Sequence, residues 1–93
     1  MDGAQVLNLI TLAKSSPAGA AVPGTGLEVA VITEPSKAEL ERDLWLLVLT
    51  GELIIDLPHG DFRILKKGDA VQLDAGLKLS YQPVEDAVVL RRG

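Results

Sequence analysis

Short apolar segments separated by turn-forming residues follow one another along the second half of the chain. Turn residues stand at 50–51, 58–61, 66–69 and 74–76. Between and after these turns lie five segments of strand character: Glu52–Leu57, Phe62–Leu65, Ala70–Leu73, Lys78–Gln82 and Ala87–Arg91. Strands at intervals of about 8–12 residues with turns between them are typical of a β-sandwich or barrel. The pattern therefore predicts an all-β fold.

The segment Pro35–Leu49 is compatible with two structures. Its apolar residues recur at helical spacing after a proline that suits an early helical position. In contrast, Leu44–Leu49 is continuously apolar, as in a strand that is covered on both faces. Because strands surround it in the sequence, we predict a strand at Leu44–Leu49 and at most a short helical turn near 36–41.

Three elements are predicted ahead of that segment. Gln5 to Leu12 mixes apolar and polar residues in a way that suits a partly covered strand, so residues 1–12 are predicted to contain an N-terminal strand. Residues 15–26 are rich in glycine and proline and are predicted to form a loop. This loop is either a surface connection or a linker that lets residues 1–12 reach a neighbouring subunit. The β-branched segment Leu27–Thr33 is predicted to be a strand.

Length, composition and charge narrow the class of protein. The 93 residues are enough for one small domain, so residues 1–93 are taken as a single unit. A net charge of −4 and 3% aromatic residues argue against nucleic-acid binding, which needs basic surfaces and stacking rings. Apolar runs are far shorter than the ~20 residues that a membrane-spanning helix requires. With no cysteine and no recognisable signal segment, we expect a cytoplasmic protein without a membrane partner.

Two stretches resemble the cupin family of small antiparallel jelly-roll barrels. Leu44–Leu53 is similar to the cupin strand that ends in a turn glycine, here Gly51, and is followed by a hydrophobic strand. Leu65–Leu77, with Gly68-Asp69 before a strand, and Tyr81 are similar to the second cupin motif. The resemblance covers roughly the last two-thirds of the chain. It implies a jelly-roll barrel of the cupin type.

The same resemblance implies where a metal would bind. Metal-dependent cupins follow G-x5-H-x-H-x3,4-E-x6-G and later G-x5-P-x-G-x2-H-x3-N, in which three histidines and a glutamate hold a divalent metal inside the barrel. Aligned on Gly51, the glutamate position falls on Leu44. With the shorter spacing, the first two histidine positions fall on Ala38 and Leu40.

With the longer spacing, these two histidine positions fall instead on Lys37 and Glu39. The third histidine position, counted from Gly68, falls on Leu79. Leucine and alanine have no lone pair to donate, so at most one ligand, Glu39, is left. We therefore expect neither a metal site nor a cofactor.

Alternation along Leu44–Leu49 leaves apolar side chains on both faces of the strand. Leu44, Leu46 and Val48 share one face, and we expect them to line the barrel with Leu79 and Tyr81. The barrel could hold a small apolar ligand that the Tyr81 hydroxyl orients. Alternatively its own side chains fill it, as is common in small barrels.

Trp45 and Leu47 lie on the opposite face of this strand and also need cover. A continuous apolar patch of this kind marks an interface, so we expect a homodimer with Trp45 and Leu47 near the contact. The alternative is that residues 1–12 of the same chain dock as a terminal strand and cover them.

No residue is predicted to be catalytic. His59, the sole histidine, stands in the turn 58–61, and turns commonly run over the surface. The function predicted from the sequence is a metal-free, non-catalytic binding or interaction module. The alternative is a metal-independent isomerase or epimerase that acts on a small metabolite through Tyr81 and a nearby carboxylate.

Overall fold

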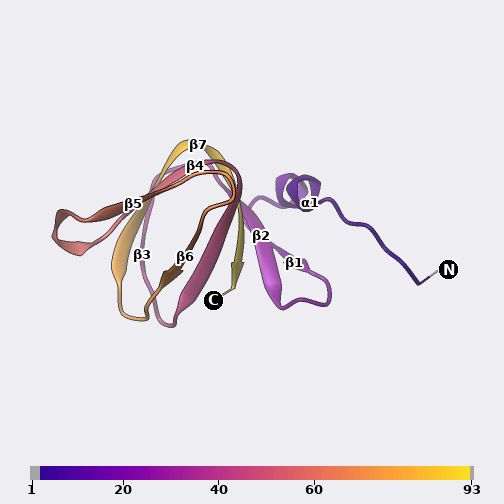
Figure 1. The fold of residues 1–93 in the computed structure, drawn as a ribbon, viewed down its shortest axis with the longest axis horizontal. Helices are drawn as coiled ribbons and strands as arrows, with labels where there is room; N and C mark the ends of the chain where they lie inside the picture. The colour runs from indigo at the N-terminus through magenta and orange to yellow at the C-terminus, as the bar shows by residue number, and fades with distance from the viewer. Residues whose placement is uncertain (1–2, 93) are drawn as a thin grey trace.

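A computed structural model of the chain describes residues 3–92, and its backbone is mostly antiparallel sheet (Figure 1). The elements in chain order are α1 (Leu9–Ser15), β1 (Ala20–Val22), β2 (Leu27–Ile32), β3 (Ser36–Glu39), β4 (Leu44–Asp56), the 3-10 turn η1 (Pro58–Gly60), β5 (Phe62–Leu65), β6 (Ala70–Leu73) and β7 (Lys78–Arg92). The all-β prediction is thereby confirmed. Among the described residues, no helix has the length and apolar character needed to cross a membrane.

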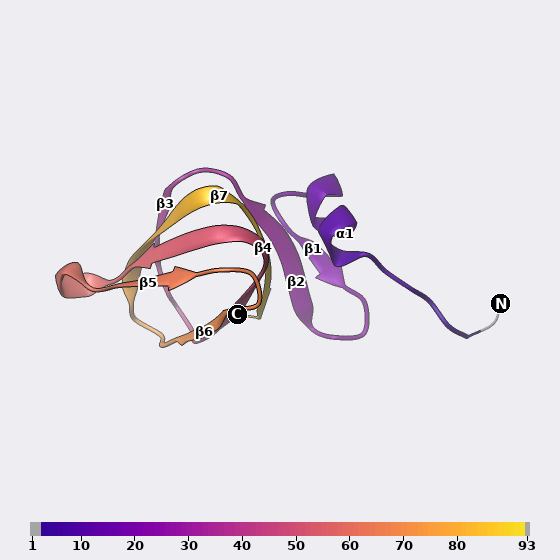
Figure 2. The same ribbon diagram turned by 45° about the horizontal axis from the view of Figure 1, so that its top comes forward.

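Two long strands organise the barrel. β4 and β7 pair with each other along most of their length, and each also pairs with different partners at its two ends. At one end the strand order is β1-β2-β7-β4-β6, and at the other it is β3-β7-β4-β5. The strands curl around a common interior, while α1 and β1 lie to one side (Figure 2).

Buried apolar side chains form two clusters on opposite faces of the sheet. The inner cluster lies inside the barrel and consists of Ala30, Leu46, Val48, Leu53, Ile55, Leu65, Leu73, Leu79, Ala87 and Val89. The outer cluster consists of Ala13, Val22, Val29 and Val88, and joins α1 to β1, β2 and β7. Successive residues Val88 and Val89 belong to different clusters, because neighbouring side chains of a strand point to opposite faces.

The turn predicted at residues 50–51 is wrong, since β4 continues through it. The pairing with β7 shifts register on both sides of Gly51, as in a bulged region where a strand bends without leaving its ladder. Gly51 has φ +85°, and a Cβ there would lie 2.2 Å from the backbone oxygen of Asp86. Glycine is required here by the close approach of β7. The two segments predicted within 78–91 likewise form one strand, β7.

The strand predicted within residues 1–12 is also wrong. Leu9–Ser15 is helical, and the side chain of Asn8 caps the helix by accepting a hydrogen bond from the Thr11 backbone N–H at 3.0 Å. Such a cap satisfies one of the free N–H groups at a helix start. The apolar face of α1 packs on the outer cluster, with Ala13 fully buried. Residues 1 and 2 lie outside the described residues.

Two further predictions need correction. The loop predicted at residues 15–26 contains the short strand β1, which pairs with β2. The helical turn predicted near 36–41 is the strand β3, which pairs with the first residues of β7. Backbone N–H and C=O groups of β3 thus form hydrogen bonds with β7 and not within a local turn. The strands predicted at Leu27–Thr33, Phe62–Leu65 and Ala70–Leu73 are confirmed as β2, β5 and β6, with β2 ending at Ile32.

Candidate functional site

Aliphatic side chains pack the interior of the barrel. Of the residues predicted to line it, Leu46, Val48 and Leu79 are buried in the inner cluster, and Leu44 and Tyr81 are partly buried against it. Among residues 3–92, no polar or charged side chain is fully buried. The interior therefore offers mainly apolar contact.

Tyr81 is the residue through which the alternative isomerase or epimerase was predicted to act. Burial raises the pKa of its hydroxyl above the usual 10.0, and the positive charge of Arg91 partly opposes that shift. Its cross-strand neighbours are Ser36 and Ile55, which carry no charge. Tyr81 lines neither of the two larger surface grooves. The alternative of an isomerase or epimerase thus has no specific observation in its favour.

The opposite side of this sheet, which we call the outer face, carries Trp45 and Leu47. Trp45 lies in one cross-strand row with Gln72 of β6 and Arg92 of β7. Leu47 lies in the next row, beside Ala70 and Leu90. Neither Trp45 nor Leu47 belongs to the outer cluster, and both are partly exposed. The outer cluster beneath α1 therefore extends over β2, β7 and Leu49 of β4, and it leaves Trp45 and Leu47 at the start of β4 partly exposed.

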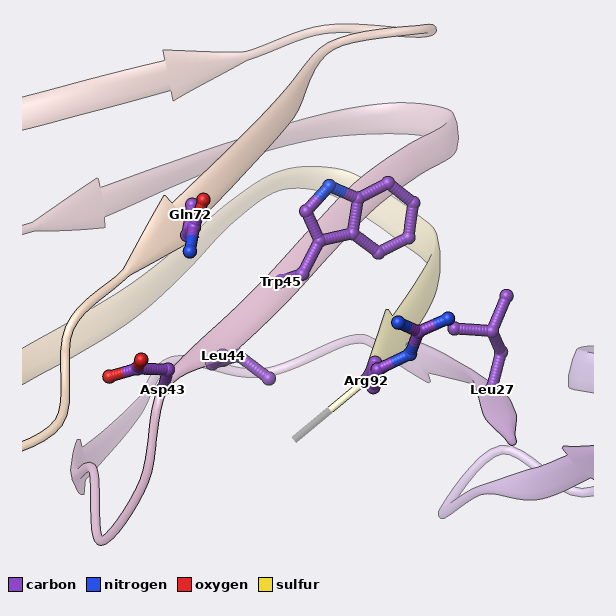
Figure 3. A pocket seen from close by; sticks show the side chains of 6 residues that line it. All are labelled: Leu27, Asp43, Leu44, Trp45, Gln72 and Arg92. Carbon is purple, nitrogen blue, oxygen red and sulfur yellow. The ribbon is translucent and has the colours of Figure 1, made fainter. Parts of the chain in front are cut away.

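A surface groove of about 620 Å³, here called the Trp45 groove, lies at this partly exposed region (Figure 3). It is lined by Leu27, Asp43, Leu44, Trp45, Gln72 and Arg92. Asp43 is held in place, since its Oδ1 accepts the backbone N–H of Ala75 at 2.8 Å. The groove combines apolar side chains with one carboxylate and one guanidinium at its rim.

An ion pair stands beside this groove. The Nε of Arg91 donates to Glu28 Oε1 at 3.0 Å, and a second guanidinium nitrogen of Arg91 donates to the same oxygen. Arg91 also donates to the backbone oxygen of Ala18 at 3.4 Å. Arg91 is thus committed to its own chain, whereas Arg92 is exposed at the groove.

A second groove of about 570 Å³ lies at the other end of the barrel, where the inner-facing side chains Ala38, Leu57 and Leu79 form part of its lining. Lys37, Ser80 and Asp56 form one row across β3, β7 and β4, and Glu39 and Lys78 also line this groove. Two lysines face two carboxylates here, so the groove presents no excess charge to attract an ion.

Sequence reasoning identified only part of the Trp45 groove. The alternation of β4 placed Trp45 on the outer face, but Leu27, Gln72 and Arg92 come from three other strands. Nothing in a single sequence gives the register between β4, β6 and β7. For Leu27, Gln72 and Arg92, the sequence indicated only that short strands lie at or near these positions.

Comparison with known proteins gives the fold. No protein-family model and no curated protein matches the sequence. Protein NMB1881 from Neisseria meningitidis superposes with a TM-score of 0.75 at 12% identity, over 94% of this chain and 97% of that one. A cupin-2 domain protein from Shewanella frigidimarina gives a TM-score of 0.64 at 15% identity, over 70% of this chain and 65% of that one. The chain has a cupin fold.

A DUF1255 protein of unknown function from Acidithiobacillus ferrooxidans has a TM-score of 0.67 at 16% identity, over 72% of this chain. The chain spans 65% of the length of that protein and of the Shewanella protein. At such identities the likeness to these solved structures concerns the fold alone, because one fold supports many unrelated functions.

The metal-binding positions of the cupin motifs can now be located in the structure. Ala38 and Leu40 pack against the inner cluster, together with Leu44 and the buried Leu79. Ala38 and Leu79 are direct partners across β3 and β7. The shorter spacing therefore gives the inward positions, and Glu39, the one donor of the longer spacing, is exposed.

These four inward side chains do not fit a metal in a cupin barrel. Divalent metals bind through imidazole nitrogen, thiolate or carboxylate oxygen, and alanine and leucine supply none of these. Within residues 3–92, no three His, Cys, Asp or Glu side chains come together in a way that could hold a metal ion.

Proposed function

We propose that this chain is a metal-free cupin module that binds other molecules without catalysing a reaction, and that it works as a homodimer. The aliphatic side chains at the cupin metal positions support the metal-free part of this proposal. Because apolar side chains pack the interior, the binding surface is the outside of the barrel. We also propose a cytoplasmic location, since a chain without cysteine does not depend on an oxidising compartment.

The observation that carries the proposal is the pair of partly exposed apolar side chains, Trp45 and Leu47, on the outer face. Trp45 and Leu47 point away from the inner cluster and lie outside the area that α1 covers. Tryptophan and arginine, here Trp45 and Arg92, are enriched among the residues that dominate protein interfaces. A two-fold dimer would bring this same patch of both copies together and remove it from water.

Sedimentation equilibrium of the purified protein tests this assignment. We expect a concentration-dependent dimer, and Trp45→Asp should weaken association about 30-fold or more, because a central interface residue contributes about 2 kcal/mol. Phe62→Asp is the matched control, since Phe62 is an aromatic residue with 53% exposure on β5. It should leave association unchanged. A wild-type monomer at high concentration, or a dimer that only Phe62→Asp disrupts, would overturn the proposed interface.

A further inference from the structure

The strand β5 lies at an edge of the sheet and exposes apolar side chains. Among the described residues, it pairs with β4 alone. Phe62 and Ile64 are 53% and 50% exposed. Their side chains point away from the barrel interior, because they alternate along the strand with Leu65 of the inner cluster. An edge strand with exposed apolar side chains is a template for pairing with a strand of another chain.

The ladder with β4 determines which backbone groups of β5 face the free edge. The backbone oxygen of Asp61 accepts a hydrogen bond from the Leu57 N–H at 2.8 Å. From this point, hydrogen-bonded and non-hydrogen-bonded pairs alternate along the antiparallel ladder. Arg63 is therefore hydrogen-bonded to β4, whereas the N–H and C=O groups of Phe62 and Ile64 point to the free edge.

An ion pair already occupies the edge groups of Phe62. The Phe62 N–H donates to Asp61 Oδ1 at 2.9 Å, and Arg63 donates to the Phe62 backbone oxygen at 2.8 Å. The same nitrogen of Arg63 donates to Asp61 Oδ1 at 2.8 Å. The hydrogen bond from Arg63, followed by that from Phe62, lowers the pKa of Asp61 below its usual 3.8. The carboxylate is therefore charged at neutral pH and holds both partners.

The turn after β5 limits how a second strand can pair with this edge. The Lys66 N–H donates to Asp69 Oδ2 at 2.9 Å, and the Lys66 backbone oxygen accepts from the Asp69 N–H at 2.8 Å. Both backbone groups of Lys66 are thus committed to its own turn. A neighbouring strand can use the edge groups of Phe62 and Ile64.

These two residues are complementary to the same two residues of a second copy. In an antiparallel pair of β5 strands centred on Arg63, Phe62 of each copy lies opposite Ile64 of the other. Each such pair can exchange both of its backbone hydrogen bonds, and the apolar side chains meet on one face of the joined sheet. The two Arg63 side chains then lie directly opposite each other, where like charges repel.

We propose that the Asp61–Arg63 ion pair keeps the edge of β5 closed to a second copy of this chain. The ion pair occupies the backbone groups of Phe62 that a second β5 needs, and Arg63 adds repulsion between the copies. Without it, the edge becomes an interface with β5 of another copy. This inference does not depend on the homodimer proposed through Trp45, which lies in the part of β4 that pairs with β6.

Sedimentation equilibrium of Asp61→Ala/Arg63→Ala tests the inference. Every chain also carries Trp45→Asp, so that contacts through Trp45 are weakened and the β5 edge is measured by itself. We expect self-association at least tenfold stronger than in the Trp45→Asp chain, because two hydrogen bonds and a like-charge contact no longer oppose pairing. Glu41→Ala/Arg42→Ala is the matched control, since it removes the same charges from exposed residues between β3 and β4. It should leave association unchanged.

A further substitution shows whether the new association uses the β5 edge. Ile64→Pro removes an N–H group that faces the free edge and keeps the ladder with β4, since edge strands tolerate proline at such positions. Added to the Asp61→Ala/Arg63→Ala chain, it should return association to the level of the Trp45→Asp chain. Ile64→Lys should do the same by placing a charge in the apolar contact. Circular dichroism should show the same fold throughout, because the side chains of Asp61 and Arg63 are 56% and 52% exposed.

The outcomes separate this inference from the proposed homodimer. Unchanged association of the Asp61→Ala/Arg63→Ala chain would overturn the inference. Association that persists in both Ile64 variants would do so too, since it would then use another surface. Either result leaves the homodimer standing, whereas a wild-type protein that stays monomeric contradicts the homodimer alone.

Discussion

At the scale of single residues, four aliphatic side chains decide the character of the barrel. Ala38, Leu40, Leu44 and Leu79 fall at the ligand positions of the cupin metal motifs, and they belong to or pack against one apolar cluster. The exchange of nitrogen and oxygen donors for hydrocarbon converts a polar pocket into part of the core. The ionisable side chain of Tyr81 packs against this cluster, and its titration reports on the apolar surroundings.

We predict that Tyr81 titrates above pH 10 in the folded protein. Burial raises its pKa, so the folded state holds the proton more tightly than the unfolded state does. The resulting stabilisation is fully present below the unfolded pKa of about 10 and is lost as pH rises through the folded value. Because the chain has one tyrosine, absorbance at 295 nm follows this group alone.

The protein unfolded in urea is the reference for this titration. In urea the inflection should return to about pH 10, and the alkaline fall in unfolding free energy should be smaller in Tyr81→Phe than in the wild type. A folded-state inflection at or below 10.0 would contradict the burial of this hydroxyl.

At the scale of elements, Gly51 allows β4 to run unbroken from one end of the barrel to the other. Its positive φ is left-handed, and its missing side chain makes room for the β7 backbone at Asp86. The register shifts around it bend the strand, so that β4 pairs with β6 before the bend and with β5 after it.

We predict that Gly51→Ala destabilises the protein by about 3 kcal/mol or more, measured by urea unfolding. Left-handed backbone costs an alanine about 1–2 kcal/mol, and displacing the β7 backbone adds a further packing cost of about 1–3 kcal/mol. Gly68→Ala and Gly76→Ala are matched controls. These glycines have similar φ values, +90° and +89°, and open space around them. They should lose only the backbone part, and an equal loss at all three positions would refute the steric explanation.

The elements also show what a single sequence can and cannot predict. Alternation and turn residues were sufficient for β2, β5 and β6, because their hydrophobic pattern and their ends are local features. The strand state of β3 depends on pairing with β7, which is remote in sequence. Gly51 had the signature of a turn but serves a bulge, since close approach of another strand leaves no mark in the local pattern.

The prediction for the residues of α1 was wrong for a different reason. Its N-cap Asn8 and its apolar spacing were readable, but the short apolar segment fitted a strand equally well. For the candidate site, alternation was enough to place Trp45 and Leu47 on the outer face. The other side chains of the Trp45 groove come together through cross-strand register, which only the folded chain provides.

At the scale of the whole molecule, we propose that the interior serves stability and that the outer surface carries the function. The inner cluster contains no donor set for a metal, and we propose that the partly exposed Trp45 and Leu47 of β4 associate with a second copy. We thus propose a metal-free interior together with a homodimer. A bound metal ion and a second chain would each add to the mass of the intact particle.

Native mass spectrometry of the protein, purified without chelators, tests both parts in one measurement. We expect a particle of twice the 9.9 kDa chain mass with no metal adduct, and no stoichiometric adduct after incubation with zinc, nickel, iron or manganese. A particle that carries one metal ion per chain, or a monomer at concentrations where a dimer should form, would contradict the proposal.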